Sequence, residues 1–404
     1  MRIARALLVL APLAALAACT DGTAPPASPD AAAMTPARRA ADLAAVDLGT
    51  LGGATSTAWD VNDRGVVVGG SQVGGEGGET HAFRWTVATG MCDLGTLGGD
   101  YSVASAVNRH GVVAGTSTNA SGETRVVTWS ESGVIRDLGT IPGSTFIGAS
   151  AINDRGEIVG TYCTDADPCR GFRWTEGTGL QPVPVAEGEE VYFADVNRRG
   201  DVAGRFCCGR ATYYGMFLLE ASGAFHDIGG VTDANAGANA LNAHGVVVGS
   251  DQPEDVGAPY LLAPVVWSSG QGLRVLGSLG GDYGFANDVN DRGEIVGGST
   301  TVPGDCCATN AFSWTGRGGM VDLGPGRAHA ISERGTIVGV RDGRAVLWSS
   351  DRAFATAARP VRAAPATGKA AAAAASDRCG GDPAIVASET ALQRCLWETA
   401  RRRR

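Results

Sequence analysis

The chain has 404 residues, a formal net charge of −9, 60 glycines and ten cysteines. The charge is uneven, because residues 44–350 carry 19 basic and 34 acidic side chains while residues 351–404 carry 10 basic and 5 acidic ones. A body with a formal charge of −15 repels nucleic acid and anionic lipid, so the composition argues against either as a partner of the folded part.

The first 18 residues are typical of a signal peptide. Two arginines precede an apolar run over residues 6–18, which suits a signal sequence but is too short to span a bilayer as a helix. The run ends in Leu16-Ala17-Ala18-Cys19, which resembles the lipobox of bacterial lipoproteins. That resemblance implies cleavage before Cys19 and lipidation of its thiol. The alternative is an ordinary signal peptide in which Cys19 is incidental.

Residues 19–45 are rich in alanine and proline, and we expect a disordered tether between Cys19 and the folded body. Thr20 follows the cysteine, so the aspartate that retains lipoproteins in the inner membrane is absent. We therefore expect an exported protein on the outer membrane or cell surface, held to the membrane by its lipid anchor only.

A five-residue phrase that ends in glycine recurs seven times. The second residue of the phrase is asparagine in six copies and serine in the last, and successive copies lie 42 to 48 residues apart: Asn62, Asn108, Asn153, Asn197, Asn242, Asn290 and Ser332. A run of small apolar residues precedes each copy. A valine-rich run, an aromatic run such as 83–85 and, in most units, an Asp-Leu-Gly segment such as 93–95 follow it. Four strands in each repeat of this length predict an all-β, seven-bladed β-propeller over residues 46–350.

The repeat also predicts local structure. Asparagine followed three residues later by glycine favours a tight hairpin turn, with glycine in the left-handed conformation. Alanine stands four residues before the asparagine in six units, and Phe193 replaces it in the fourth. An Asp-Leu-Gly segment at 47–49 precedes the first unit and none follows Trp348. Residues 46–48 are therefore expected to supply the outer strand of the blade over about 328–348, which closes the ring.

Between Asp47 and Trp348 the sequence resembles the bacterial extracellular HAF-repeat family. The matching residues are Asp93-Leu94-Gly95-Thr96-Leu97-Gly98-Gly99, Ser105, Val107-Asn108, Gly111-Val112-Val113 and His81-Ala82-Phe83-Arg84-Trp85. The resemblance implies a surface or secreted repeat domain without an established activity. In the fourth repeat Pro182-Val183-Pro184 replaces Asp-Leu-Gly and Leu218 replaces tryptophan, so we expect an irregular blade there.

Nine cysteines remain after Cys19, and an oxidising compartment would allow them to pair. Cys163 and Cys169 flank one loop and are expected to bridge it. The other candidates for disulfides are Cys207, Cys208, Cys306, Cys307, Cys379 and Cys395, which leaves Cys92 as the unpaired thiol. A zinc site is the competing interpretation, but no histidine lies in these loops. Residues 351–404 are expected to form an alanine-rich linker and a short basic segment.

The sequence contains no nucleophile elbow, zinc-protease motif or phosphate loop, and no cofactor is predicted. The aspartates of the Asp-Leu-Gly segments are expected to satisfy backbone groups at a strand end. Two residues before the repeat asparagine stand Asp60, Asp195 and Asp288, where the other units have alanine. Near the axis these carboxylates could gather a cation such as calcium. The favoured alternative is that each one caps its own hairpin turn.

The leading functional hypothesis is a monomeric ring that acts as a non-enzymatic binding module for a glycan or an envelope protein. Ligands of propellers lie at the channel mouth, where loops of several blades converge. The candidate ligand-binding residues share the position three before the repeat asparagine: Trp59, Asn239, Asn287 and His329. The alternatives are a hydrolase or lyase that acts on an extracellular polymer through its acidic residues, or a purely structural envelope scaffold.

Overall fold

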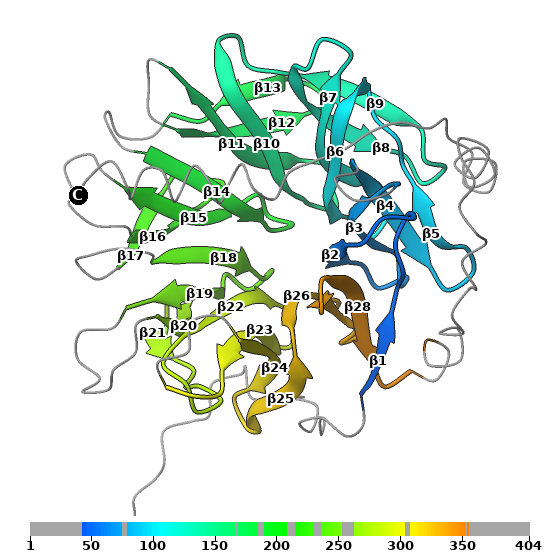
Figure 1. Ribbon diagram of the computed structural model, residues 1–404. Coiled ribbons are helices and arrows are strands. Elements are labelled where there is room, and N and C mark those ends of the chain that lie inside the picture. Colours follow the sequence, from blue (N-terminus) through cyan, green and yellow to red (C-terminus); the bar gives the residue numbers. More distant parts are fainter. Residues whose placement is uncertain are drawn as a thin grey trace, which may run out of the picture. The chain divides into compact units, whose positions relative to one another are not determined.

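The computed structural model describes residues 43–74, 79–165, 169–184, 190–207, 215–229, 236–252, 262–303, 308–351 and 354. Over these ranges the chain forms 28 β-strands, arranged as seven four-stranded antiparallel sheets. Figure 1 shows the sheets around a common axis, each with its first strand innermost. The prediction of an all-β, seven-bladed propeller is confirmed. None of the described segments forms a helix long and apolar enough to cross a membrane.

The blades follow one another along the chain. Blade 1 contains β2 (Ser56–Val61), β3 (Val67–Gln72), β4 (Thr80–Thr86) and β5 (Gly90–Asp93). Blade 2 contains β6 (Gly98–Val107), β7 (Val113–Asn119), β8 (Thr124–Trp129) and β9 (Ile135–Gly139). Blade 3 contains β10 (Ser144–Ile152), β11 (Ile158–Thr164), β12 (Arg170–Thr175) and β13 (Gly179–Pro182). Blade 4 contains β14 (Glu190–Val196), β15 (Val202–Cys207), β16 (Gly215–Leu219) and β17 (Phe225–Gly229).

The remaining blades repeat the pattern. Blade 5 contains β18 (Gly237–Leu241), β19 (Val247–Asp251), β20 (Ala263–Ser268) and β21 (Gly272–Val275). Blade 6 contains β22 (Gly284–Val289), β23 (Ile295–Thr300), β24 (Thr309–Thr315) and β25 (Gly319–Pro325). Blade 7 contains β26 (Arg327–Ile331), β27 (Ile337–Arg341), β28 (Arg344–Ser349) and, as its outer strand, β1 (Ala44–Asp47).

The ring closes as predicted. Strand β1 runs antiparallel to β28, with Val46 opposite Leu347, so the two ends of the propeller share one sheet (Figure 1). The side chains of Val46 and Leu48 are buried in the core between blades 7 and 1. A second contact lies beyond β28, where the ring of Phe354 stacks at 6.4 Å on Trp85 of blade 1. The segments that precede and follow the blades along the chain, β1 and Phe354, therefore both stabilise the junction between blades 7 and 1.

The repeat asparagine ties adjacent blades together. Its side-chain oxygen accepts N–H groups of its own turn, as Asn62 does from Arg64 and Val66 at 3.0 and 3.2 Å. Its amide donates to the backbone carbonyl of the corresponding residue in the next blade, as Asn62 does to Asn108 at 2.9 Å. The same donation recurs from Asn108, Asn153, Asn197, Asn242 and Asn290, the last to Ser332. The predicted turn is confirmed, and the asparagines also link the blades by a series of hydrogen bonds from Asn62 to Ser332.

Each inner strand carries a β-bulge three residues before the repeat asparagine. In blade 1 Ala58 pairs with Gly69 and Asp60 with Val68, so Trp59 is the extra residue, and the other six blades show the same shift. A Cβ on Gly69 would lie 2.0 Å from the carbonyl oxygen of Thr57. The glycine of the valine-rich run is needed because the bulged strand approaches it too closely for any side chain.

Phe193 replaces the usual alanine without disturbing the packing. The residue that faces it from blade 3 is Gly171, and a Cβ there would lie 2.5 Å from the Phe193 ring. Between blades 1 and 2 the same two positions hold Ala82 and Ala104. The large residue and the missing side chain compensate for each other. The expectation of an irregular fourth blade is wrong, because Pro182 and Leu218 lie in different blades, each with four strands.

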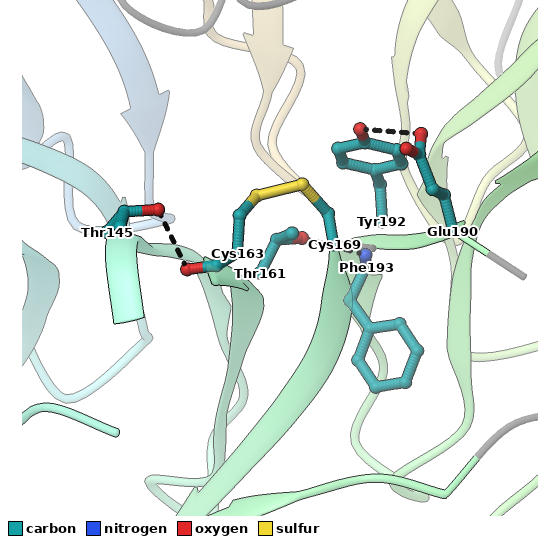
Figure 2. The surroundings of a disulfide bond; sticks show 7 residues. All are labelled: Thr145, Thr161, Cys163, Cys169, Glu190, Tyr192 and Phe193. Carbon is teal, nitrogen blue, oxygen red and sulfur yellow. Dashed lines mark hydrogen bonds between the residues drawn. A yellow bond between two sulfur atoms is a disulfide. The ribbon is translucent and has the colours of Figure 1, made fainter. Parts of the chain in front are cut away.

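The disulfide between Cys163 and Cys169 is confirmed. It joins the end of β11 to the residue before β12, and Thr145 of β10 donates a hydrogen bond to the carbonyl of Cys163 (Figure 2). Cys92 was expected to be unpaired, and this is wrong, since both Cys92 and Cys207 are disulfide-bonded. Sequence spacing shows no nearby partner for Cys92. The predictions for Cys19, Cys208, Cys306, Cys307, Cys379 and Cys395 lie outside the described residues.

Candidate functional site

The bulge directs one residue of each inner strand toward the axis. These residues are Trp59, Ser105, Ser150, Ala194, Asn239, Asn287 and His329. They include all four ligand-binding candidates from the sequence. A bulge re-aims a side chain and frees it from the alternation of the strand. The position varies in polarity because the sheet itself does not depend on its side chain.

A cavity of about 850 Å³ lies above this layer of bulged residues. Its walls are the first residues of the inner strands and the last residues of the second strands, so it opens at the end of the ring opposite the asparagine turns. The lining comes from blades 1 to 4 and from Ala238 and Asn239 at the start of blade 5. Its volume falls within the range of small-molecule sites, about 300–1,000 Å³.

The cavity is one-sided because the bulged residues differ in size. Those of blades 2, 3 and 4 are Ser105, Ser150 and Ala194, which leave space above them. In blades 5 and 6 the side chains of Asn239 and Asn287 instead reach across to the next blade. They donate to the carbonyls of Ala286 and Ala328 at 2.8 and 2.7 Å, respectively.

Trp59 and His329 come together where the last blade meets the first. Their rings stack with centroids 4.5 Å apart and an interplanar angle of 14°. The Nδ1 atom of His329 donates to the carbonyl oxygen of Ala58 at 2.8 Å. Burial lowers the pKa of His329 to about 4, and the nearby Arg327 adds to this shift. The imidazole is therefore neutral at pH 7 and supports the indole of Trp59.

The structure thus brings the four candidates into one layer but gives them different roles. Trp59 and Asn239 line the cavity. Asn287 and His329 do not line it, and their side chains connect neighbouring blades.

Sequence reasoning missed the aromatic residues Tyr101, Phe146 and Tyr192 and the basic residue Arg205, which line the cavity. The three aromatic residues lie seven or five positions before a repeat asparagine. Counting back by two from the bulge position would have found them, since alternate residues of a strand share a face.

The three inner-strand aspartates act on the backbone. Asp60 accepts the N–H of Val61 at 2.6 Å with one oxygen and that of Val107, in blade 2, at 2.7 Å with the other. Asp195 and Asp288 make the equivalent pairs of bonds to blades 5 and 7. Each aspartate therefore joins the end of its own inner strand to the next blade. The prediction that it caps its own hairpin turn is wrong, because the repeat asparagine accepts the N–H groups of that turn.

Burial raises the pKa of Asp60 to about 6, and the backbone N–H groups of Val107 and Val61 oppose this shift. Burial also raises the pKa of Asp195, and it raises that of Asp288 well above its ordinary value, with the charges of Asp195 and Asp60 adding to it. Within the described ranges no three His, Cys, Asp or Glu side chains are placed to hold a metal ion.

The aspartates of the Asp-Leu-Gly segments are structural, as predicted. Asp93 accepts the N–H of Gly95 at 2.8 Å and also bonds to Nδ1 of His81 on the adjacent strand. The pairs at the corresponding positions of other blades are Arg125 with Asp137, Asn310 with Asp322, and Arg344 with Asp47. The pair of His81 and Asp93 is therefore one version of a repeated strand contact rather than a catalytic dyad.

No family model matches the chain, and no curated protein matches it in sequence. Among solved structures, the β-propeller domain of the Trilobed protease from Pyrococcus furiosus aligns with a TM-score of 0.51 at 8% identity, over 74% of this chain and 97% of that one. TolB from Acinetobacter baumannii aligns at 0.42 and 10% identity, over 74% and 64%. The gluconolactonase XC5397 from Xanthomonas campestris aligns at 0.38 and 13%, over 64% and 88%.

This chain therefore spans less than two thirds of TolB. At such identities the likeness establishes the fold alone. The Pyrococcus domain is described as having an open velcro topology. In this chain β1 pairs with β28 and closes the ring.

Proposed function

We propose that this propeller is a non-enzymatic binding module whose ligand occupies the axial cavity of blades 1 to 4. The observation that carries the proposal is the cavity itself, which lies over the small bulged residues of blades 2 to 4 and is lined by aromatic and hydroxyl side chains. Asp60 and Asp288, the acidic residues that the sequence offered for a hydrolase or lyase, are engaged with the backbone. Both carboxylate oxygens of Asp60 and of Asp288 accept N–H groups.

The proposal includes the setting that the sequence suggests. A signal peptide over residues 1–18 and lipidation of Cys19 would export the ring and anchor it at the outer membrane or cell surface. We also propose that the ring is related to the HAF-repeat family. Mass spectrometry of the protein from detergent-solubilised membranes tests this part. A diacylated or triacylated N-terminal peptide that begins at Cys19 is expected, and an unmodified cysteine in that peptide contradicts the anchor.

The cavity is tested by the melting temperature of the full chain against a panel of glycans, peptides and cations. A ligand that binds only the folded state stabilises it by about 2.7 kcal/mol at a concentration of 100 Kd. Ser105→Trp should fill the cavity and abolish the shift, whereas the exposed Thr178→Trp should leave it unchanged. A shift that survives Ser105→Trp contradicts the site, and no shift with any compound favours a structural scaffold. Turnover of a polymer that Asp60→Asn abolishes would establish the enzyme instead.

A further inference from the structure

We infer that the ligand of the axial cavity is an uncharged oligosaccharide that lies along the inner strands of blades 1 to 4. This inference rests on the proposed function, and it adds the chemical class of the ligand and the residues that select it.

The charge of the lining argues against an ionic ligand. Of the 26 residues that line the cavity, only Asp100 and Arg205 are charged, and they have opposite signs. The guanidinium of Arg205 lies 4.6 Å from the centre of the Tyr192 ring, so it is already stacked on an aromatic face. A polyanion or a basic peptide would lose water from many charges and gain at most one partner for them, which is unfavourable.

Hydroxyl groups dominate the polar part of the lining. Eleven residues are serine or threonine: Thr55, Ser56, Thr57, Ser71, Thr80, Ser105, Thr116, Thr118, Thr124, Ser150 and Thr161. The hydroxyls of Thr116 and Thr161 accept the N–H groups of Ala149 and Phe193, both at 3.2 Å; Thr161 and Phe193 are drawn in Figure 2. A hydroxyl both donates and accepts, so this wall pairs with sugar hydroxyls in either direction.

Aromatic rings supply the apolar surface that a sugar also requires. Trp59, Tyr101, Phe146 and Tyr192 come from four consecutive blades, one from each, and all are half-buried. Two of them are held in place, Trp59 by the ring of His329 and Tyr192 by Arg205 and by its hydrogen bond to Glu190 (Figure 2). The C–H faces of pyranose rings pack on such surfaces, while Tyr and Trp offer a polar edge as well.

The arrangement favours a chain of sugars over a single one. One ring in each of four successive blades forms an arc of contacts, and a cavity of about 850 Å³ accommodates several linked units. A monosaccharide would contact the ring of one or two blades and leave the rest of the wall unpaired.

Calorimetric titration of the full chain with maltohexaose, cellohexaose, laminarihexaose and chitohexaose tests the inference. Hyaluronan hexasaccharide and a basic hexapeptide serve as charged probes. At least one uncharged hexaose should bind, and Tyr101→Ala should weaken it about tenfold. The matched control is Tyr283→Ala, since Tyr283 also lies seven residues before a repeat asparagine but does not line the cavity. It should change affinity less than twofold, and both variants should keep the wild-type melting temperature.

The outcomes separate the two proposals. Binding of a charged probe alone, lost in Ser105→Trp, refutes the glycan and keeps the binding site. Equal weakening by Tyr101→Ala and Tyr283→Ala places the glycan elsewhere and refutes the inference. Failure of every probe to bind refutes the ligand class, and the melting-temperature panel with Ser105→Trp then decides the proposed function independently.

Discussion

Replacing Gly171 with alanine places a methyl group where the ring of Phe193 already lies. The new Cβ would be 2.5 Å from ring carbons, whereas real Cβ atoms stay more than 3.0 Å from their neighbours. Both residues are buried, and Phe193 is only 2% exposed. Overpacking of this kind costs about 1–3 kcal/mol. Gly171 does not have a positive φ, so the loss would come from the contact and not from backbone strain.

In a Phe193→Ala background the effect of Gly171→Ala on stability should change sign. Phe193→Ala alone should destabilise the fold by about 3–5 kcal/mol, because it leaves a cavity between blades 3 and 4. In that background Gly171→Ala fills part of the cavity and recreates the pair formed by Ala82 and Ala104 between blades 1 and 2. It should then stabilise by about 0.8 kcal/mol, the value of one buried methylene. The coupling between the two changes is therefore about 2–4 kcal/mol, within or slightly above the usual range for contacting residues.

Urea denaturation of the four proteins, followed by tryptophan fluorescence, measures this cycle. Gly177→Ala is the control, because a Cβ on Gly177 meets nothing within 4 Å. It should change the free energy of unfolding by no more than about 0.5 kcal/mol. Additive effects of the two changes, or a Gly171→Ala variant as stable as the control, would show that Gly171 and Phe193 do not compensate for each other.

Three other perturbations test the ring. Deletion of residues 44–50 removes the buried Val46 and Leu48 and opens blade 7, so it should cost about 3–6 kcal/mol and lower Tm sharply; an unchanged Tm would exclude the closure. Asn62→Ala leaves turn N–H groups and a carbonyl of the next blade unpaired, and should lower the free energy of unfolding measured in urea by about 2–4 kcal/mol. Asn62→Asp should lower it less, because the aspartate keeps an oxygen that accepts the turn N–H groups. The third perturbation concerns Asp60, whose pKa is about 6 in the folded chain and 3.8 ordinarily. Between these two pH values the folded state binds more protons than the unfolded state, so the stability of the fold decreases as the pH rises. When the pH is lowered from 7.5 to 4.5, Tm should therefore rise less for Asp60→Asn than for the wild type. Equal rises in Tm would contradict the raised pKa of Asp60.

Much of the fold could be predicted because each repeated residue has a repeated task. The asparagine, the turn glycine and the Asp-Leu-Gly segment recur since every blade needs the same hydrogen bonds. Ring closure followed from one strand signal at residues 47–49 without a unit before it. These inferences required only the order of strands along the chain.

The remaining features depend on which residues face each other across blades. Sequence spacing identified Phe193 as an exception but not Gly171 as its partner, because the two are 22 positions apart and in different sheets. The sequence predicts a turn cap at Asp60, but its two oxygens accept the N–H groups of Val61 in its own strand and of Val107 in the next blade. Contacts between blades have no local signature in the sequence.

The division between constant and variable positions explains how such a ring can carry a site. Its hydrogen bonds between blades run largely through backbone groups and through the repeat asparagine, which leaves the bulged residue of each inner strand free to change. Where that residue is asparagine or histidine, as at Asn287 and His329, it adds a further bond between blades. Where it is small, as at Ser105 and Ala194, space remains and the cavity forms. Substitution at one position per blade can therefore move, enlarge or close the cavity without altering the fold, and this favours a role in which the scaffold is constant and the ligand is selected by a few side chains.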